Sequence, residues 1–387
     1  MLLRDSAHYT PPANVRKMMK DLALLPLWYA GEGDYVFAGE ECPPLSAWLP
    51  AGISLPALPL TRKELRHEPP SLPHLEAAPW GVSRQSIRLF GELKQTYGLD
   101  LAIPAWEEAY VALTSRRTAA LCLAEIRRLL PSLAFPPAPV FFTQSDDIEA
   151  YLRRQPGSFV LKAPYSSSGR GLIWLNENGF CESERNRTRG ILRKQGAISL
   201  EHRLNKVADF ALEFCSDGKG NLKYEGLSVF ATDKRGGYKE NRLQQQSALW
   251  EQLLEYIAGE ELLRVQAATT QALRHIYASC YTGYMGVDML IYQRPDETYG
   301  IHPCVEVNLR YTMGMAALRL FENHLAPHAS ARFTILYESA PCRAYEQHRR
   351  MTQLHPPEIR KGKLQKGYLS LCPVTEETHY LACILAG

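Results

Sequence analysis

Apolar residues recur at every third or fourth position in two stretches of the first half of the chain, and this spacing predicts helices. In the first stretch, residues 83–97, Ser83 can cap the N-terminus and Gly98 ends the pattern. The second stretch, residues 115–130, begins at Ser115 and ends before a group of prolines. Later apolar patterns predict helices at about 145–154, 244–258 and 262–281.

Shorter runs of apolar and β-branched residues predict strands. They lie at 140–143, 159–163, 172–175, 208–215, 224–232, 286–292 and 302–309, with a further pair at 367–371 and 380–385. Residues 164–171 are too few for a crossover helix, so the strands on either side should form a hairpin. Residues 1–112 give a weaker pattern: short strands are expected at 27–30 and 34–38, and prolines exclude long elements from 43–73. Together these elements predict an α+β fold with more than one lobe.

Length and composition narrow the class of protein. A chain of 387 residues is too long for one ordinary core, and 45% hydrophobic with 22% charged residues is typical of a globular protein. A net charge of +3, from scattered basic residues, argues against nucleic acid and membrane surfaces as partners. The N-terminus has no apolar signal-peptide core, no later stretch is long enough to span a membrane, and the nine cysteines are too scattered for a disulfide frame or a zinc site. We therefore expect a cytoplasmic protein with reduced thiols.

A lysine at the end of a predicted strand is followed by a loop of small residues. After Lys162 come Ser166, Ser167, Ser168, Gly169, Arg170 and Gly171. An ammonium group, beside backbone N–H groups that glycine and serine leave accessible, is suited to hold phosphate. The loop is not a Walker loop, because the order Gly-x-x-x-x-Gly-Lys and the following helix are absent. Taken alone, the pattern fits the tip of a flexible hairpin equally well.

Polar and apolar side chains alternate in the strand expected at 302–309. The alternation places Glu306, Asn308 and Arg310 on one face, opposite an apolar face. Carboxylate and amide oxygens are ligands for Mg²⁺, and an arginine one step beyond them can neutralise a transferring phosphoryl group. Asp288 lies inside another apolar strand and needs a partner there, which a shared metal site would supply. The solvated face of a surface strand would look similar, but it seldom combines these groups with an all-apolar back.

An extended segment carries acidic residues on either side of a short turn. Glu201 precedes the turn, which includes Leu204, and Asp209 follows it. The backbone of such a segment could pair with the edge of an adenine ring, and Asp209 could accept hydrogen bonds from ribose hydroxyls. Acidic residues beside a turn are common, so the pattern alone also fits an ordinary hairpin.

The order of these motifs along the chain resembles the ATP-grasp superfamily, which includes D-alanine–D-alanine ligase, glutathione synthetase and carbamoyl phosphate synthetase. The resemblance covers about residues 114–320. It implies an ATP-grasp fold, in which two α+β lobes grip ATP, with an additional N-terminal lobe and a short C-terminal extension. The corresponding division of the chain is 1–112 for the N-terminal lobe, 113–197 for the small lobe, 198–330 for the large lobe and 331–387 for the extension.

The resemblance also implies a role for each motif. It places Lys162 on the α- and β-phosphates of ATP and makes the segment from Ser166 to Gly171 a flap over them. Glu201 to Leu204 would be the adenine hinge, and Asp209 would bind the ribose. Mg²⁺, with Mn²⁺ as an alternative, would be held by Asp288, Glu306 and Asn308. Arg310 would lie at the γ-phosphate and the substrate carboxylate.

The chain departs from the family pattern in two places. Many members carry an earlier lysine on the phosphates, but here Arg116 and Arg117 occupy the matching place, and Arg117 is the favoured candidate. Residues 1–112 show no Rossmann-like pattern, so the substrate stays open. The loop at 230–241, which includes Lys234 and Arg235, lies where such ligases carry a substrate-facing loop, although its charges also fit an ordinary hairpin.

These features lead us to expect a ligase that uses ATP to join a small-molecule carboxylate to an amine or a thiol. A kinase of the same superfamily and a non-catalytic nucleotide-binding regulatory protein are the alternatives. The three retained metal-ligand candidates, Asp288, Glu306 and Asn308, argue against the non-catalytic alternative. A homodimer is compatible with the sequence, which does not identify the acid or the amine.

Overall fold

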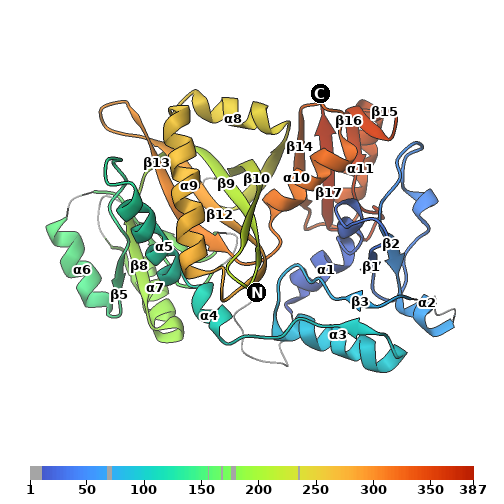
Figure 1. Ribbon diagram of the computed structural model, residues 1–387, viewed down its shortest axis with the longest axis horizontal. Helices are drawn as coiled ribbons and strands as arrows, with labels where there is room; N and C mark the ends of the chain where they lie inside the picture. Colours follow the sequence, from blue (N-terminus) through green and yellow to red (C-terminus); the bar gives the residue numbers. More distant parts are fainter. Residues whose placement is uncertain (1–10, 68–71, 156, 167–168, 176–179, 234–235) are drawn as a thin grey trace. The chain divides into compact units, whose positions relative to one another are not determined.

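The computed structural model describes residues 11–67, 72–155, 157–166, 169–175, 180–233 and 236–387 (Figure 1). Contacts between residues divide the chain into two compact units. The first unit comprises residues 107–238 and 250–312, and the second comprises the described residues before 107 together with 239–249 and 313–387. No helix in these described ranges is both long and apolar enough to cross a bilayer.

Two antiparallel sheets form the framework of the first unit. The smaller sheet has the strand order β5-β8-β6-β7, and the larger has the order β13-β12-β9-β10. The strands of the smaller sheet are β5 (Val140–Phe142), β6 (Phe159–Lys162), β7 (Leu172–Trp174) and β8 (Ile198–His202). Those of the larger sheet are β9 (Asn205–Asp217), β10 (Leu222–Thr232), β12 (Thr282–Gln293) and β13 (Tyr299–Asn308).

Helices cover both sheets of the first unit. They are α4 (Ala109–Leu113), α5 (Arg116–Leu129), α6 (Ser145–Arg154), α7 (Glu182–Gln195) and α9 (Gly259–Ile276). Helices α6 and α7 enclose the apolar core of the smaller sheet, while α5 packs on β13 and against α9 (Figure 1). The Ser115 hydroxyl accepts a hydrogen bond from the Arg117 backbone N–H at 3.2 Å, which fixes the start of α5. The position of α5 on β13 therefore sets where its first residues meet the larger sheet.

The second unit contains five neighbouring strands in the order β11-β14-β17-β16-β15. Its strands are β11 (Tyr238–Leu243), β14 (Ala331–Tyr337), β15 (Glu358–Arg360), β16 (Lys363–Ser370) and β17 (Tyr380–Ala386), and two parallel pairs join β1 (Tyr35–Phe37) to β2 (Leu58–Leu60) and β3 (Leu75–Glu76) to β4 (Leu101–Ala102). Its helices are α1 (Ala13–Asp21), α2 (Arg62–His67), α3 (Arg84–Tyr97), α10 (Met313–His324) and α11 (Arg343–Leu354). Trp28 is fully buried, and its indole N–H donates to the Leu371 carbonyl at 2.7 Å while its own carbonyl accepts from His324.

The α+β class predicted from the sequence is confirmed, as are the two strongest helices with their serine caps and the hairpin of β6 and β7. Two expectations are wrong. A strand expected at 27–30 is instead part of a 3₁₀ helix, Leu25–Trp28, because Pro26 has the fixed φ that starts a helical turn. The helix expected at 244–258 is shorter, α8 (Gln246–Leu254), because Ala258 is extended and caps α9. The four-part division of the chain stays a prediction.

Candidate functional site

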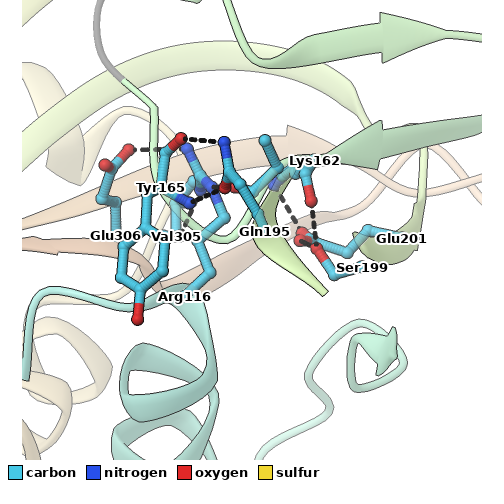
Figure 2. Close-up of polar contacts among 9 residues, drawn as sticks. Arg116, Lys162, Tyr165, Gln195, Ser199, Glu201, Val305 and Glu306 are labelled. Carbon is cyan, nitrogen blue, oxygen red and sulfur yellow. Dashed lines mark hydrogen bonds and ion pairs between the residues drawn. The ribbon is translucent and has the colours of Figure 1, made fainter. Parts of the chain in front are cut away.

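Lys162 and Glu201 form a buried ion pair within the smaller sheet (Figure 2). Lys162 ends β6 opposite Ser199 of β8, so Glu201, two residues further along β8, lies diagonally across from it. Lys162 Nζ and Glu201 Oε2 are 2.5 Å apart, and the two side chains are only 11% and 10% exposed. Burial alone would raise the pKa of Glu201, but the Lys162 ammonium holds that pKa below its usual value. The carboxylate of Glu201 is therefore ionised and pairs with the lysine charge.

The turn between β6 and β7 is compact in its described part. The Ala163 N–H donates to the Gly171 carbonyl at 2.9 Å. A Cβ at Gly171 would lie 2.3 Å from the Cβ of Ser166, so only glycine fits where the turn closes. Gly169 adopts a φ of +71°, and Arg170 is exposed. The small residues predicted to form a flap thus stand at a closed hairpin end, while Ser167 and Ser168 lie outside the described residues.

Asp288, Glu306 and Asn308 lie side by side on β12 and β13. Asp288 is directly opposite Glu306, and the Asn308 amide donates a hydrogen bond to Asp288. Arg310, beyond the end of β13, lies close enough to Asp288 to interact electrostatically with it. Burial, reinforced by the carboxylates of Glu306 and Glu213, raises the pKa of Asp288 to about 8. The structure brings these four predicted residues together, and their roles stay predictions.

Glu213 of β9 extends this row of polar residues. It lies opposite Gly286 of β12 and accepts hydrogen bonds from the Ser228 and Thr312 hydroxyls at 3.1 and 2.8 Å. A Cβ at Gly286 would lie 2.6 Å from Glu213 Oε2, so the glycine makes room for the carboxyl group. Burial raises the pKa of Glu213 to about 7. The sequence motifs did not identify Glu213 as a site residue. A signal was present, because Glu213 is a carboxylate within the apolar run 210–214, and the same kind of signal indicated Asp288.

Arg116, the first residue of α5, connects the two sheets of the first unit (Figure 2). Its guanidinium lies 2.9 Å from Glu306 Oε2 and also donates to the carbonyls of Ala163 and Val305 at 3.1 and 3.4 Å. Arg117, the arginine favoured from the sequence, places its guanidinium 4.8 Å from the centre of the Phe141 ring. Arg116 is therefore the arginine that the structure brings to the row of carboxylates, and a phosphate contact by Arg117 stays a prediction.

His302 of β13 faces the Lys162–Glu201 pair. It is 5% exposed, and in the described part of the chain no other residue hydrogen-bonds to its Nδ1. Burial, reinforced by the Lys162 charge and opposed by Glu201, lowers the pKa of His302 to about 4. The imidazole is therefore neutral near pH 7. Its place beside Lys162 arises from the packing of the two sheets, which is not visible in the local sequence.

The predicted hinge and ribose residues lie at the turn between β8 and β9. Leu204 lies in this turn, and Asp209 lies on β9. The Asp209 carboxylate accepts hydrogen bonds from Lys206 Nζ at 2.5 Å and Thr232 Oγ1 at 2.8 Å. Asp209 and Glu213 are separated by an even number of positions along β9, so their side chains lie on the same face of the sheet. Asp288, which pairs with Ala211 between them, lies on that face too. The ribose role of Asp209 stays a prediction.

The predicted substrate-facing loop contacts the start of β7. Lys234 and Arg235 lie outside the described residues, but Asp233 holds the adjoining turn by accepting hydrogen bonds from the N–H groups of Gly236 and Gly237. Gly236 has a φ of +81°, and a Cβ there would lie 2.8 Å from Leu172 Cδ1. The loop after β10 and the strand after the glycine turn are thus in direct contact.

The donors on β12 and β13 fit a hard divalent cation. Two carboxylates and one amide offer the oxygen ligands that Mg²⁺ prefers, and the strand register places them side by side. Among the described residues, no three His, Cys, Asp or Glu side chains form a metal-binding group. A magnesium site does not require three such side chains, because Mg²⁺ usually takes several of its ligands from phosphates and water. The oxygens of Asp288, Glu306 and Asn308 would supply the rest.

Comparisons with known proteins find likeness in structure alone. No protein-family model matches the sequence, and no curated protein matches it. N5-carboxyaminoimidazole synthetase from Staphylococcus aureus is 12% identical with a TM-score of 0.49 over 96% of this chain and 91% of that chain. Biotin carboxylase from Campylobacter jejuni is 10% identical with a TM-score of 0.49 over 86% and 77%. D-alanyl-alanine synthetase A from Vibrio cholerae is 13% identical with a TM-score of 0.38 over 60% and 64%. These neighbours are ATP-grasp enzymes, but at such identities and TM-scores the likeness assigns neither a reaction nor a substrate.

Proposed function

We propose that the protein is an ATP-grasp ligase that uses ATP and Mg²⁺ to activate a carboxylate as an acyl phosphate, which an amine or a thiol then attacks. One observation carries this proposal: Arg310 lies beside the polar row of Asp288, Glu306 and Asn308. A guanidinium beside a metal-phosphate site can hold a carboxylate in a bidentate manner. Such a guanidinium suits a carboxylate acceptor better than a neutral hydroxyl, because it can pair with the acceptor as well as with the γ-phosphate.

The chain's residues have separate tasks in this proposal. Lys162 binds the α- and β-phosphates, while Glu201 fixes its ammonium in place. Arg116 holds the Glu306 carboxylate in one orientation, 2.9 Å away. Bound Mg²⁺ would neutralise phosphate charge and be held by the oxygens of Asp288, Glu306 and Asn308. Catalysis is then positioning and charge neutralisation, and no side chain forms a covalent bond with the substrate.

Arg310 orients the substrate carboxylate for the first step. A carboxylate oxygen attacks the γ-phosphorus, the bond from phosphorus to the bridging oxygen breaks, and ADP leaves. In the second step the amine nitrogen attacks the acyl carbon, inorganic phosphate leaves with the carboxylate oxygen, and the nitrogen loses a proton. The products are an amide, ADP and phosphate.

Oxygen-18 tests this reaction against its alternatives. Amino acids and small carboxylates are first screened for stimulation of Mg²⁺-dependent ADP release, and the active acid is then supplied with oxygen-18 in its carboxylate. We expect one labelled oxygen in the inorganic phosphate, and loss of that transfer in the variant Arg310→Gln. A stable phosphorylated product would instead indicate a kinase, and unlabelled phosphate would also overturn the ligase, because the phosphoryl group would then have passed to water. ATP binding without ADP release for any acid would indicate a regulatory protein.

A further inference from the structure

Two tyrosine rings meet near the end of the polar row where Arg310 follows β13. Tyr284 lies two residues before Gly286 on β12, so its side chain emerges on the face that carries Asp288. Its ring meets that of Tyr311, the residue after Arg310, with the centroids 5.0 Å apart and the ring planes at 81°. Both tyrosines are partly exposed, as is Arg310. A cation and two aromatic residues, all partly exposed, therefore lie at one end of the row, with the Tyr311 hydroxyl buried.

A third tyrosine, Tyr281, holds the backbone at Tyr284. Tyr281 is 4% exposed, its hydroxyl donates to the backbone carbonyl of Tyr284 at 2.9 Å, and it lies within electrostatic range of the Arg310 guanidinium. Its ring packs edge to face against Tyr110 at a centroid distance of 5.5 Å. A buried side chain thus holds the backbone that carries Tyr284.

We propose that Arg310, Tyr284 and Tyr311 form the subsite for the acid, and that this acid carries an aromatic or similarly flat apolar group next to its carboxylate. The inference rests on the proposed function, because it takes Arg310 as the carboxylate contact. The guanidinium binds the carboxylate, and the two perpendicular rings offer one face and one edge to a planar group. A short aliphatic acid would leave these rings uncovered and gain nothing from them.

A second tyrosine pair in the same unit provides a matched control. Tyr256 and Tyr299 also meet edge to face, with centroids 5.0 Å apart and planes at 73°. Tyr299 begins β13 at the end remote from Asn308, so this pair has no part in the polar row. Tyr284→Leu and Tyr299→Leu therefore remove the same kind of packing, and only the first removes part of the proposed subsite.

The test measures binding directly, by saturation-transfer NMR with phenylacetate and L-phenylalanine against acetate and L-alanine, with ADP and Mg²⁺ present. We expect an aromatic probe to bind more tightly than its aliphatic counterpart, and Tyr284→Leu to weaken that binding about tenfold, as the loss of an apolar pocket contact does. Arg310→Gln should also weaken it, and Tyr299→Leu should not. If Tyr284→Leu does not fold, Tyr311→Leu takes its place.

In the binding experiment, three results would overturn the inference: aliphatic probes that bind as tightly as aromatic ones, no binding of either aromatic probe, or equal losses of affinity in Tyr284→Leu and Tyr299→Leu. A separate hydroxylamine assay, which traps an acyl phosphate as a hydroxamate, tests the proposed reaction. Aromatic binding without hydroxamate would reject the ligase and keep the subsite. Hydroxamate from aliphatic acids alone would keep the ligase and reject the subsite.

Discussion

Replacing His302 with leucine should change how the stability of the fold depends on pH. Burial lowers the pKa of His302 from the ordinary value of 6.5 to about 4. The unfolded chain therefore takes up a proton near pH 6.5 that the folded chain does not bind until the pH approaches 4. Because the unfolded state binds more protons in this window, wild-type stability is lost as the pH falls through it.

The two pKa values set the size of the effect. For one such group, the free energy of unfolding falls by about 2 kcal/mol between pH 7 and pH 5, and by about 3 kcal/mol by pH 4. Lys162 on β6 and Arg127 on α5 oppose protonation of the imidazole, and Glu201 on β8 favours it. Leucine does not titrate, so the variant should escape this loss.

Urea unfolding of the wild type and His302→Leu at pH 7 and pH 5 measures the difference. We expect the variant to gain about 2 kcal/mol relative to the wild type over this interval. His324 of the second unit also has a pKa lowered to about 4, but it titrates in both proteins and cancels from the comparison. A stability difference that is the same at both pH values would refute the assignment of His302 as a buried neutral imidazole.

Three further substitutions test the candidate site. Lys162→Met should weaken ATP binding by about 1.5–3 kcal/mol in calorimetry, and unchanged affinity would contradict the phosphate role. The single variant should also lose stability, because it leaves the buried Glu201 carboxylate unpaired. The double variant Lys162→Met/Glu201→Gln should recover this stability but not the affinity for ATP. Glu306→Gln should abolish Mg²⁺-dependent ADP release and leave the circular dichroism spectrum intact, whereas near-normal activity at low Mg²⁺ would exclude this strand as the metal site. Gly286→Ala should cost about 1–3 kcal/mol of stability in urea unfolding, because its methyl group would overlap Glu213 Oε2; no loss would mean that the carboxyl group moves freely.

The elements that could be predicted have strong local signals. Helices α3 and α5 each follow a serine that accepts a backbone hydrogen bond, and this cap is encoded in adjacent residues. Helix α7 had no comparable signal, because Glu182–Gln195 is almost entirely polar and contributes few apolar side chains to the core. Its formation depends on packing against α6 and the smaller sheet. Tertiary contacts determine whether such helices form, and these contacts cannot be read from a single sequence.

The candidate site also contains some contacts that the sequence predicts and others that it does not. Glu306 and Asn308 could be placed together because strand alternation fixes their common face. The pairing of Arg116 with Glu306 joins residues far apart in the chain, as does the pairing of Lys162 with Glu201. Their contacts follow from strand register and from the packing of α5 on β13. The choice of Arg116 over Arg117 depends on the direction in which each side chain leaves the first turn of α5.

The contact between Gly236 and Leu172 has a consequence for the order of events during turnover. One residue belongs to the loop expected to face the acid, and the other begins the strand that follows the phosphate turn. If both segments have their expected roles, we expect a shift of one to be felt by the other through this contact, so that occupancy of one ligand site biases the other. Thermodynamic linkage makes this bias reciprocal: whatever factor nucleotide contributes to the affinity for the acid, the acid must contribute to the affinity for nucleotide. A side chain at position 236 would press on Leu172 and strain a backbone with a φ of +81°, and we expect it to change both factors equally.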